Sequence, residues 1–272
     1  MDSLSAELLG RCGSGDEAAV RCLIEQGANV HATDEDGDGV LRYAIGPRNL
    51  DLFEFLLKSG ASASAPSTDL SGERGNSIIH AVAAAGWTGA LRLLLIQGAD
   101  PNARALSGQR PLMGAAARGS VSSIEMLGFA GADLNAVDGE GDTALYCAAS
   151  KAQLGAVVAL CELGAAVDVL PNVFGHTALS VAATIAYDSS STPEDHEISL
   201  RIAKYLARNG ASPSSMYGHG YVFGRSAGQV QQIVPLYDFD RAVRAYDDLF
   251  IGWVDRRAAG LEWVFSAQRS TR

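Results

Sequence analysis

The sequence predicts an all-α fold, an elongated solenoid of about six helix-turn-helix units with short hairpin loops and an aromatic-rich helical extension. Two observations lead to this prediction. Gly-Ala pairs recur along the chain at intervals of 33, 38, 33, 33 and 46 residues, and an apolar stretch with helical spacing precedes them. A period near 33 residues indicates one supersecondary unit stacked on copies of itself, because a single copy cannot bury its apolar face. The units are expected to end near Gly27, Gly60, Gly98, Gly131, Gly164 and Gly210.

Each of these glycines is expected to close the second helix of its unit. Gly98, for example, comes just after an apolar stripe that contains Leu91 and Leu94. A helix commonly ends at a left-handed residue, and glycine adopts that conformation without strain. Alanine pairs such as Ala148-Ala149 on the first helix let neighbouring units approach closely, while Leu, Ile and Val fill the layer between them. The predicted stack therefore stabilises helices that would be marginal alone.

The fifth unit is the most regular copy. It contains Gly141-Asp142-Thr143-Ala144-Leu145, then Ala148-Ala149, an apolar run and Gly164-Ala165. This unit resembles the ankyrin repeat, whose pattern is roughly G-x-T-P-L-H-x-A-A-x-x-G followed by a second helix and a Gly-Ala pair. The resemblance covers about residues 4–214 and implies helix pairs with a concave groove, lined by hairpin tips and first helices, in which partners bind.

The chain is expected to divide into the solenoid, residues 1–214, and a carboxyl-terminal extension, residues 215–272. Extra residues fall in two loops, between Ser62 and Gly75 and around Ser189–Thr192. Phosphorylation of the second loop is possible, although an unstructured loop is the better interpretation. Because Thr192 is a good helix cap and Pro193 suits a first helical position, the next helix is expected to run from Pro193 to about Asn209.

Ten of the 19 aromatic residues follow Met216. Five apolar side chains there have spacings of 4, 3, 4 and 3, which places them on one face of a predicted helix: Phe239, Val243, Tyr246, Phe250 and Trp253. A surface helix does not leave such a stripe in water. Two interpretations are open: the extension caps the exposed end of the solenoid, or it folds back and closes the groove.

Composition excludes several classes of function. A formal net charge of −10 argues against nucleic-acid binding, which needs clustered Lys and Arg. No run of about 18 apolar residues is present, and the amino terminus lacks the basic start and apolar segment of a secretory signal. A cytoplasmic protein without membrane contact is therefore expected. The four cysteines lack the close spacing of a metal or redox site, so neither a metal nor a cofactor is predicted.

The resemblance implies a set of groove residues. They are hairpin-tip positions, first-helix positions that replace the repeat's histidine, and nearby aromatic residues. This predicted binding set consists of Asp36, Asp38, Arg42, Arg74, Asn76, Trp87, Gln109, Met113, Glu140, Asp142, Tyr146, Phe174 and His176. His80 is the one place that keeps the histidine, which in ankyrin repeats joins neighbouring hairpins.

The first functional hypothesis is a non-enzymatic module that binds a partner protein in the groove. The alternative is a cofactor-independent enzyme, a cyclase or isomerase of a small apolar metabolite, whose groove is closed by the extension. Its general acid and base would come from Tyr146, His176 or Asp142. The last two occupy equivalent tips in adjacent units, about 10 Å apart, which is too far for direct proton transfer. No nucleotide-binding, zinc-protease or serine-hydrolase motif is present.

Overall fold

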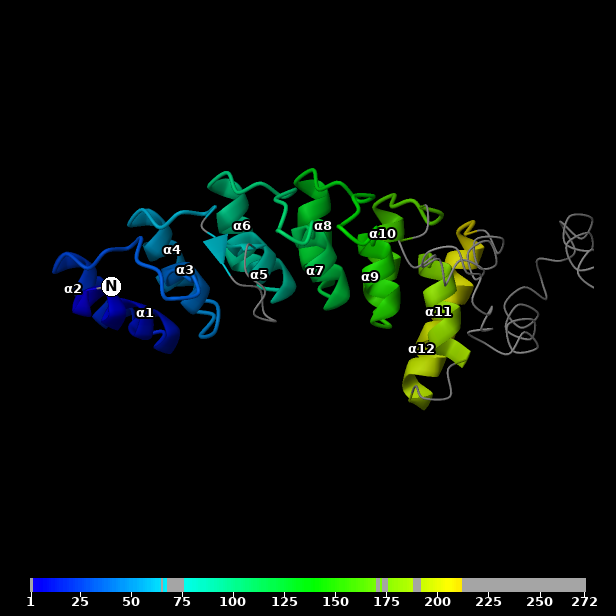
Figure 1. Ribbon diagram of the computed structural model, residues 1–272, viewed down its shortest axis with the longest axis horizontal. Helices are drawn as coiled ribbons and strands as arrows, with labels where there is room; N and C mark the ends of the chain where they lie inside the picture. Colours follow the sequence, from blue (N-terminus) through cyan, green and yellow to red (C-terminus); the bar gives the residue numbers. More distant parts are fainter. Residues whose placement is uncertain are drawn as a thin grey trace, which may run out of the picture.

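The computed structural model describes residues 2–64, 66–67, 76–169, 172, 176–187 and 192–211. These residues contain twelve helices, which form six successive pairs side by side along the long axis of the molecule (Figure 1). The first helices of the pairs are α1 (Ser3–Ser14), α3 (Val40–Tyr43), α5 (Ile78–Ala84), α7 (Pro111–Ala117), α9 (Ala144–Ser150) and α11 (Ala178–Tyr187). The second helices are α2 (Glu17–Glu25), α4 (Leu50–Lys58), α6 (Thr88–Ile96), α8 (Val121–Phe129), α10 (Leu154–Glu162) and α12 (Pro193–Arg208).

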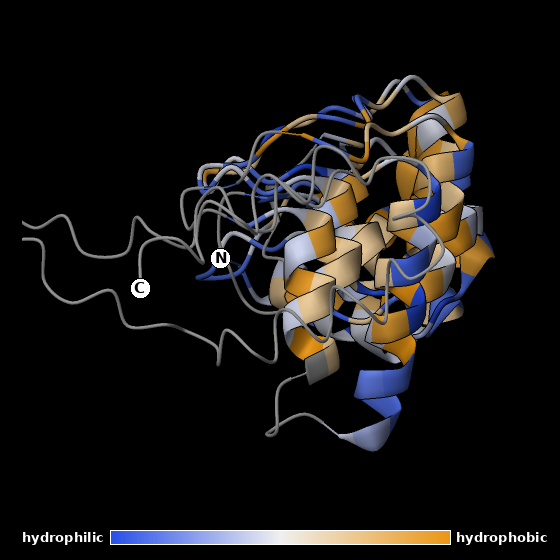
Figure 2. Ribbon diagram, turned by 90° about the vertical axis from the view of Figure 1, so that its right-hand side faces the viewer, coloured by the Kyte–Doolittle hydropathy of each residue, from blue (hydrophilic) through white to orange (hydrophobic). Residues whose placement is uncertain are grey.

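Strands are short in this part of the chain. β1 (Pro66–Ser67) pairs antiparallel with β2 (Asn76–Ser77) just before α5. Viewed along the stack, the helices gather on one side and the connecting loops on the other (Figure 2). The all-α repeat fold predicted from the sequence is therefore confirmed.

The six glycines of the repeating Gly-Ala pairs, Gly27, Gly60, Gly98, Gly131, Gly164 and Gly210, each close the second helix of a unit. All six have positive φ, between 84° at Gly98 and 98° at Gly60. The alanine that follows each glycine donates its N–H to a carbonyl five residues earlier, as Ala99 does to Leu94 at 2.9 Å. This bond satisfies a carbonyl that the helix end leaves free, and the alanine itself is buried. The structure confirms the predicted helix ends.

One continuous apolar core runs from Leu8 to Ala211. The first helices carry mostly alanine where they face each other, so they pack closely: a Cβ added to Gly114 would lie 3.4 Å from the Cβ of Ala84. Larger side chains fill the space between units. Phe53 on α4 is fully buried and meets, edge-on at 5.1 Å between ring centroids, the ring of Trp87, which precedes α6 of the next unit.

The prediction for the last helix is also confirmed. α12 begins at Pro193, and the Thr192 side chain accepts a hydrogen bond from the N–H of Asp195 at 3.1 Å. The helix ends at Arg208, one residue before the predicted limit. Residues 188–191, most of the loop that precedes it, lie outside the described residues, as do residues 68–75 and the whole of the predicted 215–272 extension.

Two positions between the paired helices have a left-handed backbone without glycine. Gly15, Gly86 and Gly119 occupy this turn in three units, whereas Arg48 and Ala152 occupy it in two others with φ of 52° and 53°. A left-handed backbone costs an L-residue roughly 1–2 kcal/mol. The extra conformational entropy that glycine loses on folding costs less, roughly 0.5–1 kcal/mol.

We therefore expect Ala152→Gly to raise the free energy of unfolding by about 0.5–1 kcal/mol. Urea denaturation followed by circular dichroism measures the change. Ala116→Gly, in the right-handed helix α7, is the control and is expected to be destabilising. Equal destabilisation by both variants would contradict the prediction.

None of the helices in the described part of the chain combines the length and hydropathy needed to cross a bilayer. All four cysteines are free thiols. Burial raises the pKa of Cys12 and Cys147 to about 12 and that of Cys161 to about 11, so these three thiols stay protonated.

Candidate functional site

The candidate site is the row of loops that precede the first helices. We call them the finger loops; they comprise residues 34–38, 105–109 and 138–142, together with Asn172 and His176. Each is closed by the same backbone bond, in which the first residue donates its N–H to the carbonyl of the fifth. The distances are 3.0 Å from Asp34 to Asp38, 2.9 Å from Ala105 to Gln109, 3.1 Å from Asp138 to Asp142 and 3.1 Å from Asn172 to His176.

Side-chain oxygens hold three of these loops in shape. The Asp34 carboxylate accepts the N–H groups of Asp36 and Asp38, both at 2.9 Å. Asp138 accepts in the same way from Glu140 and Asp142, and the Asn172 amide oxygen accepts from the N–H of His176 at 2.9 Å. Asp and Asn favour such turns because their short side chains reach nearby backbone N–H groups.

Two finger loops touch through their backbones. The N–H of Gly139 donates to the carbonyl of Ser107 at 2.9 Å. A Cβ at Gly108 would lie 2.7 Å from the nitrogen of Gly139, and a Cβ at Gly139 would lie 2.7 Å from the Ser107 oxygen. Only glycine allows this approach, which fixes the spacing of neighbouring loops.

The finger loops carry an uneven distribution of charge and apolar surface. Acidic residues concentrate in the loops of the second and fifth units: Asp34, Glu35, Asp36, Asp38, Asp138, Glu140 and Asp142. Between them, the loop of the fourth unit has no acidic residue and presents Leu106 with 84% of its surface exposed. Val137, directly before the neighbouring loop of residues 138–142, is 44% exposed. Sequence analysis missed both, because an apolar residue in a loop gives no sign of whether it is buried.

Asp142 and His176, two of the three candidates for an acid or base, are linked through Asn172. The Asn172 amide donates to the Asp142 carboxylate at 2.6 Å while its oxygen accepts from the His176 backbone. Burial raises the pKa of Asp142, against the effect of this hydrogen bond, and burial lowers the pKa of His176. Burial, followed by the charge of Asp142, raises the pKa of Tyr146.

Sequence analysis overlooked Asn172 as a member of this network. The signal that could have found it is its spacing, since Asn172 and His176 repeat the four-residue separation of Asp138 and Asp142 and of Asp34 and Asp38.

Tyr43, on α3, completes the first finger loop by donating its hydroxyl to the Asp34 carboxylate at 2.8 Å. This hydrogen bond, together with burial, raises the pKa of Tyr43 to about 12. Since the folded-state pKa lies above the ordinary value of 10, the stabilisation is complete below pH 10 and is lost as pH rises towards 12.

We expect Tyr43→Phe to lower the free energy of unfolding at neutral pH and the gap from wild type to shrink above pH 10. Urea denaturation of both proteins at pH 8, 10 and 11 measures it. A gap that stays constant over this range would contradict the assignment of the raised pKa to Tyr43.

Several predicted groove residues lie elsewhere. Trp87 is buried against Phe53, because its place before α6 directs the ring between units rather than into the groove. Met113 is 2% exposed and packs in the core, where an apolar thioether takes the place of a polar side chain. Asn76 is buried in β2. These three assignments are corrected; Arg74 and Phe174 fall outside the described residues.

The remaining predicted residues lie on or beside the finger loops, where their role in binding stays a prediction. Asp36 and Glu140 are exposed, and Gln109, Asp142, Tyr146 and His176 are half-buried. Asp38 is largely buried and pairs with the half-buried Arg42 at 3.9 Å.

His80 joins two successive loops, as the sequence comparison implied. Its Nδ1 accepts the N–H of Ser77 at 3.2 Å, and its Nε2 lies 3.2 Å from the carbonyl oxygen of Gln109 in the next finger loop. At the equivalent place in the sixth unit, the Ser180 hydroxyl accepts the N–H of Thr177 at 2.8 Å and closes only its own turn.

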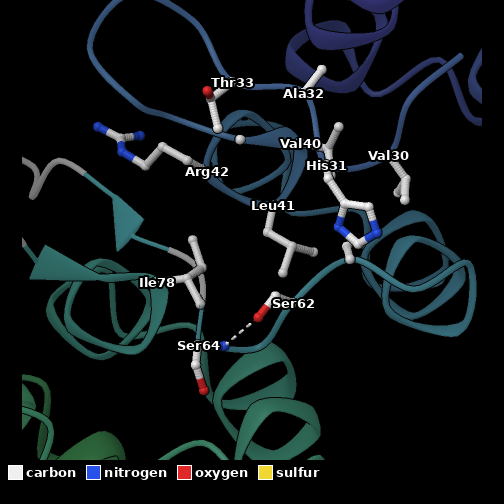
Figure 3. Close-up of a pocket in the computed structure, with 12 residues that line it drawn as sticks. Val30, His31, Ala32, Thr33, Val40, Leu41, Arg42, Ser62, Ser64 and Ile78 are labelled. Atoms are coloured by element: carbon white, nitrogen blue, oxygen red, sulfur yellow. Dashed lines mark hydrogen bonds between the residues drawn. The ribbon is translucent and has the colours of Figure 1, made fainter.

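Two cavities open near the finger loops. The larger, about 240 Å³, lies between the second and third units, with Leu41 and Ile78 near its middle and His31 and Arg42 on opposite sides (Figure 3). The smaller, beside Tyr146 and His176, holds about 10 Å³, room for one water molecule. Small-molecule sites occupy roughly 300–1,000 Å³, so each of these two cavities is smaller than a typical one. No cluster of metal-binding side chains occurs in the described residues.

Six helix pairs stacked side by side, with a row of loops that precede their first helices, define a repeat protein of the solenoid class. Comparison with known families agrees. The family model described as "Ankyrin repeats (3 copies)" matches residues 112–216, and the model described as "Ankyrin repeat" matches residues 74–106. Together they cover about half of the chain. The chain belongs to the ankyrin repeat family, which consists generally of non-enzymatic binding modules.

Curated relatives match over a limited region. E3 ubiquitin-protein ligase KEG of Arabidopsis thaliana is 34% identical over 93 residues, 34% of this chain and 6% of the relative. The NF-kappa-B p105 subunit of Gallus gallus is 36% identical over 85 residues, 31% of this chain and 8% of the relative. NF-kappa-B inhibitor zeta of Homo sapiens is 32% identical over 98 residues, 34% of this chain and 13% of the relative. The matches therefore span a small part of each relative.

Proposed function

We propose that this protein is an interaction module whose finger loops and first helices bind a partner protein in the concave groove. The observation that carries the proposal is Leu106, an 84% exposed apolar side chain between acidic finger loops. Together with the 44% exposed Val137, it puts apolar surface into a row of loops that is otherwise polar and acidic, and apolar surface with a polar rim is typical of a protein-binding site. The names of two relatives, an inhibitor and a subunit of NF-kappa-B, denote protein association and support this class of function.

The chemistry of the surface suggests the partner. Carboxylates in the loops of the second and fifth units favour lysine or arginine, and Leu106 with Val137 favours an apolar side chain between them. We therefore expect a partner segment in which basic residues flank an apolar residue. A cytoplasmic location belongs to the proposal and fits the four free thiols, because reducing compartments keep cysteines unpaired.

Selection from a random peptide library displayed on phage, with the full chain as bait, tests the proposal. Selected peptides should contain Lys or Arg on both sides of an apolar residue. Raising the salt concentration should weaken their binding, because exposed charges are screened. Leu106→Asp should reduce their affinity at least about tenfold, whereas Phe129→Asp, a control equally exposed on α8, should leave it unchanged. Selected peptides that bind Leu106→Asp as well as wild type would refute the proposal.

A further inference from the structure

The second helices of the central units expose apolar side chains to solvent. Ile96 on α6 is 71% exposed and Phe129 on α8 is 84% exposed. Each precedes its helix-closing glycine by two residues, so the two occupy equivalent positions in sequence on α6 and α8. These two helices lie side by side in the stack (Figure 1). The other four units carry a charged residue there: Glu25, Lys58, Glu162 and Arg208.

The surrounding helix surface is also poor in charge. α6, α8 and α10 contain one charged residue each, namely Arg92, Glu125 and Glu162. α2 and α4 contain three each and α12 contains six. Leu93, Met126 and Leu163 are half-buried beside Ile96 and Phe129. We call this surface of α6, α8 and α10 the outer face; helices that are apolar on nearly every side are normally covered.

We propose that residues 239–253 of this chain cover the outer face as a helix packed across α6, α8 and α10. The apolar stripe that begins at Phe239 and ends at Trp253 would lie on Ile96 and Phe129. Its opposite side is charged: Asp240, Arg241, Arg244, Asp247 and Asp248. A helix of this composition buries one face and leaves the other in water.

The exit point of the chain suits this placement. The described chain ends at Ala211, directly after Gly210 closes α12. Gly98 and Gly131 close α6 and α8 in the same way, next to Ile96 and Phe129. The chain therefore leaves the last unit at the edge of the stack that carries the exposed apolar side chains.

The lengths agree as well. Packed helices lie about 8–10 Å apart, so α8 and α6 are about 20 and 30 Å from α12. The 27 residues between Ala211 and Phe239 can span up to about 90 Å, far more than this distance requires. A helix of the 15 residues 239–253 is about 22 Å long, which matches the two helix spacings from α6 to α10.

Other places for the segment are less favourable. Among the side chains that the structure describes, none of the large apolar residues on α11 or α12 is as exposed as Ile96 or Phe129, so the end of the stack offers less apolar surface. A second copy of the chain must associate from solution, whereas a tethered segment has an effective concentration in the range of about millimolar. Packing on the outer face also leaves the finger loops open to a partner.

Hydrogen exchange on the full chain, read by mass spectrometry, tests this inference. Amides of residues 239–253 should exchange at least about tenfold more slowly than those of an unstructured peptide of the same sequence. The double variant Ile96→Asp, Phe129→Asp should lose this protection, while the peptides of α5–α10 keep the exchange rates of the wild type, which shows that the solenoid stays folded. Leu106→Asp, equally exposed but on a finger loop, should retain it.

Light scattering at several concentrations accompanies the exchange measurement, and the wild-type chain should be monomeric. The inference is overturned if residues 239–253 are unprotected in the wild type, or if the double variant keeps their protection. It is also overturned if the wild type is a dimer that the double variant dissociates, since the outer face would then bind a second copy. Each result is independent of peptide binding at Leu106.

Discussion

Replacing Phe53 by alanine is expected to lower the free energy of unfolding by about 3–5 kcal/mol. Phe53 is fully buried between the second and third units, where its ring meets Trp87 edge-on at 5.1 Å. The substitution removes the transfer free energy of the ring and leaves a cavity that helices fixed by neighbouring layers close only in part.

The loss should be local before it becomes global. In a stacked repeat each unit contacts mainly its neighbours, so a weakened layer uncouples the units on either side of it. We expect α1–α4 to unfold at lower urea concentration than α5–α12 in Phe53→Ala. Hydrogen exchange by segment, together with circular dichroism, measures this order.

Leu106→Ala provides the exposed control, and it should change the free energy of unfolding by less than about 0.5 kcal/mol. Phe53→Leu, which keeps most of the volume, should cost less than Phe53→Ala. Similar losses in Phe53→Ala and Leu106→Ala would show that this layer does not limit stability.

His80→Ala is expected to lower the free energy of unfolding by about 2–4 kcal/mol. The imidazole accepts the Ser77 N–H through Nδ1, and its Nε2 lies 3.2 Å from the Gln109 carbonyl in the next unit. Alanine cannot bond the Ser77 N–H or the Gln109 carbonyl. His80 is 6% exposed, and each buried hydrogen bond that is lost costs about 1–3 kcal/mol.

The sixth unit supplies a matched control for this prediction. Ser180 stands at the equivalent position and accepts the Thr177 N–H, and a serine hydroxyl is too short to reach a neighbouring loop as the imidazole of His80 does. His80→Ser should therefore restore the cap of α5 but not the bond to Gln109, with a loss smaller than that of His80→Ala. Urea denaturation measures both variants. If His80→Ser is no more stable than His80→Ala, the helix cap contributes little.

The repeat architecture could be predicted because its signals are local. A left-handed residue follows each second helix, and glycine supplies it at lowest cost, so Gly98 and its equivalents mark the end of every second helix. Thr192 and Pro193 located the start of α12 for the same reason, since capping depends on residues adjacent in sequence.

The site was predicted less well because exposure is not a local property. Trp87 and Met113 belong to the predicted groove set, yet both side chains are buried: Trp87 packs against Phe53 of the preceding unit, and Met113 lies in the core. Leu106 has the opposite outcome: an apolar residue that would commonly be buried lies at a loop tip with 84% of its surface in solvent.

The sequence by itself determined the period, the helix pairs and the residues that end them, because turns and caps are decided by a few neighbouring residues. Only the tertiary structure decided which side chains face solvent and which loops touch. The contact of Gly139 with Ser107, the bridge of His80 to Gln109 and the bond of Asn172 to Asp142 all join different units. Such contacts depend on the distance and rotation between stacked helix pairs, which packing sets after the local structure has formed.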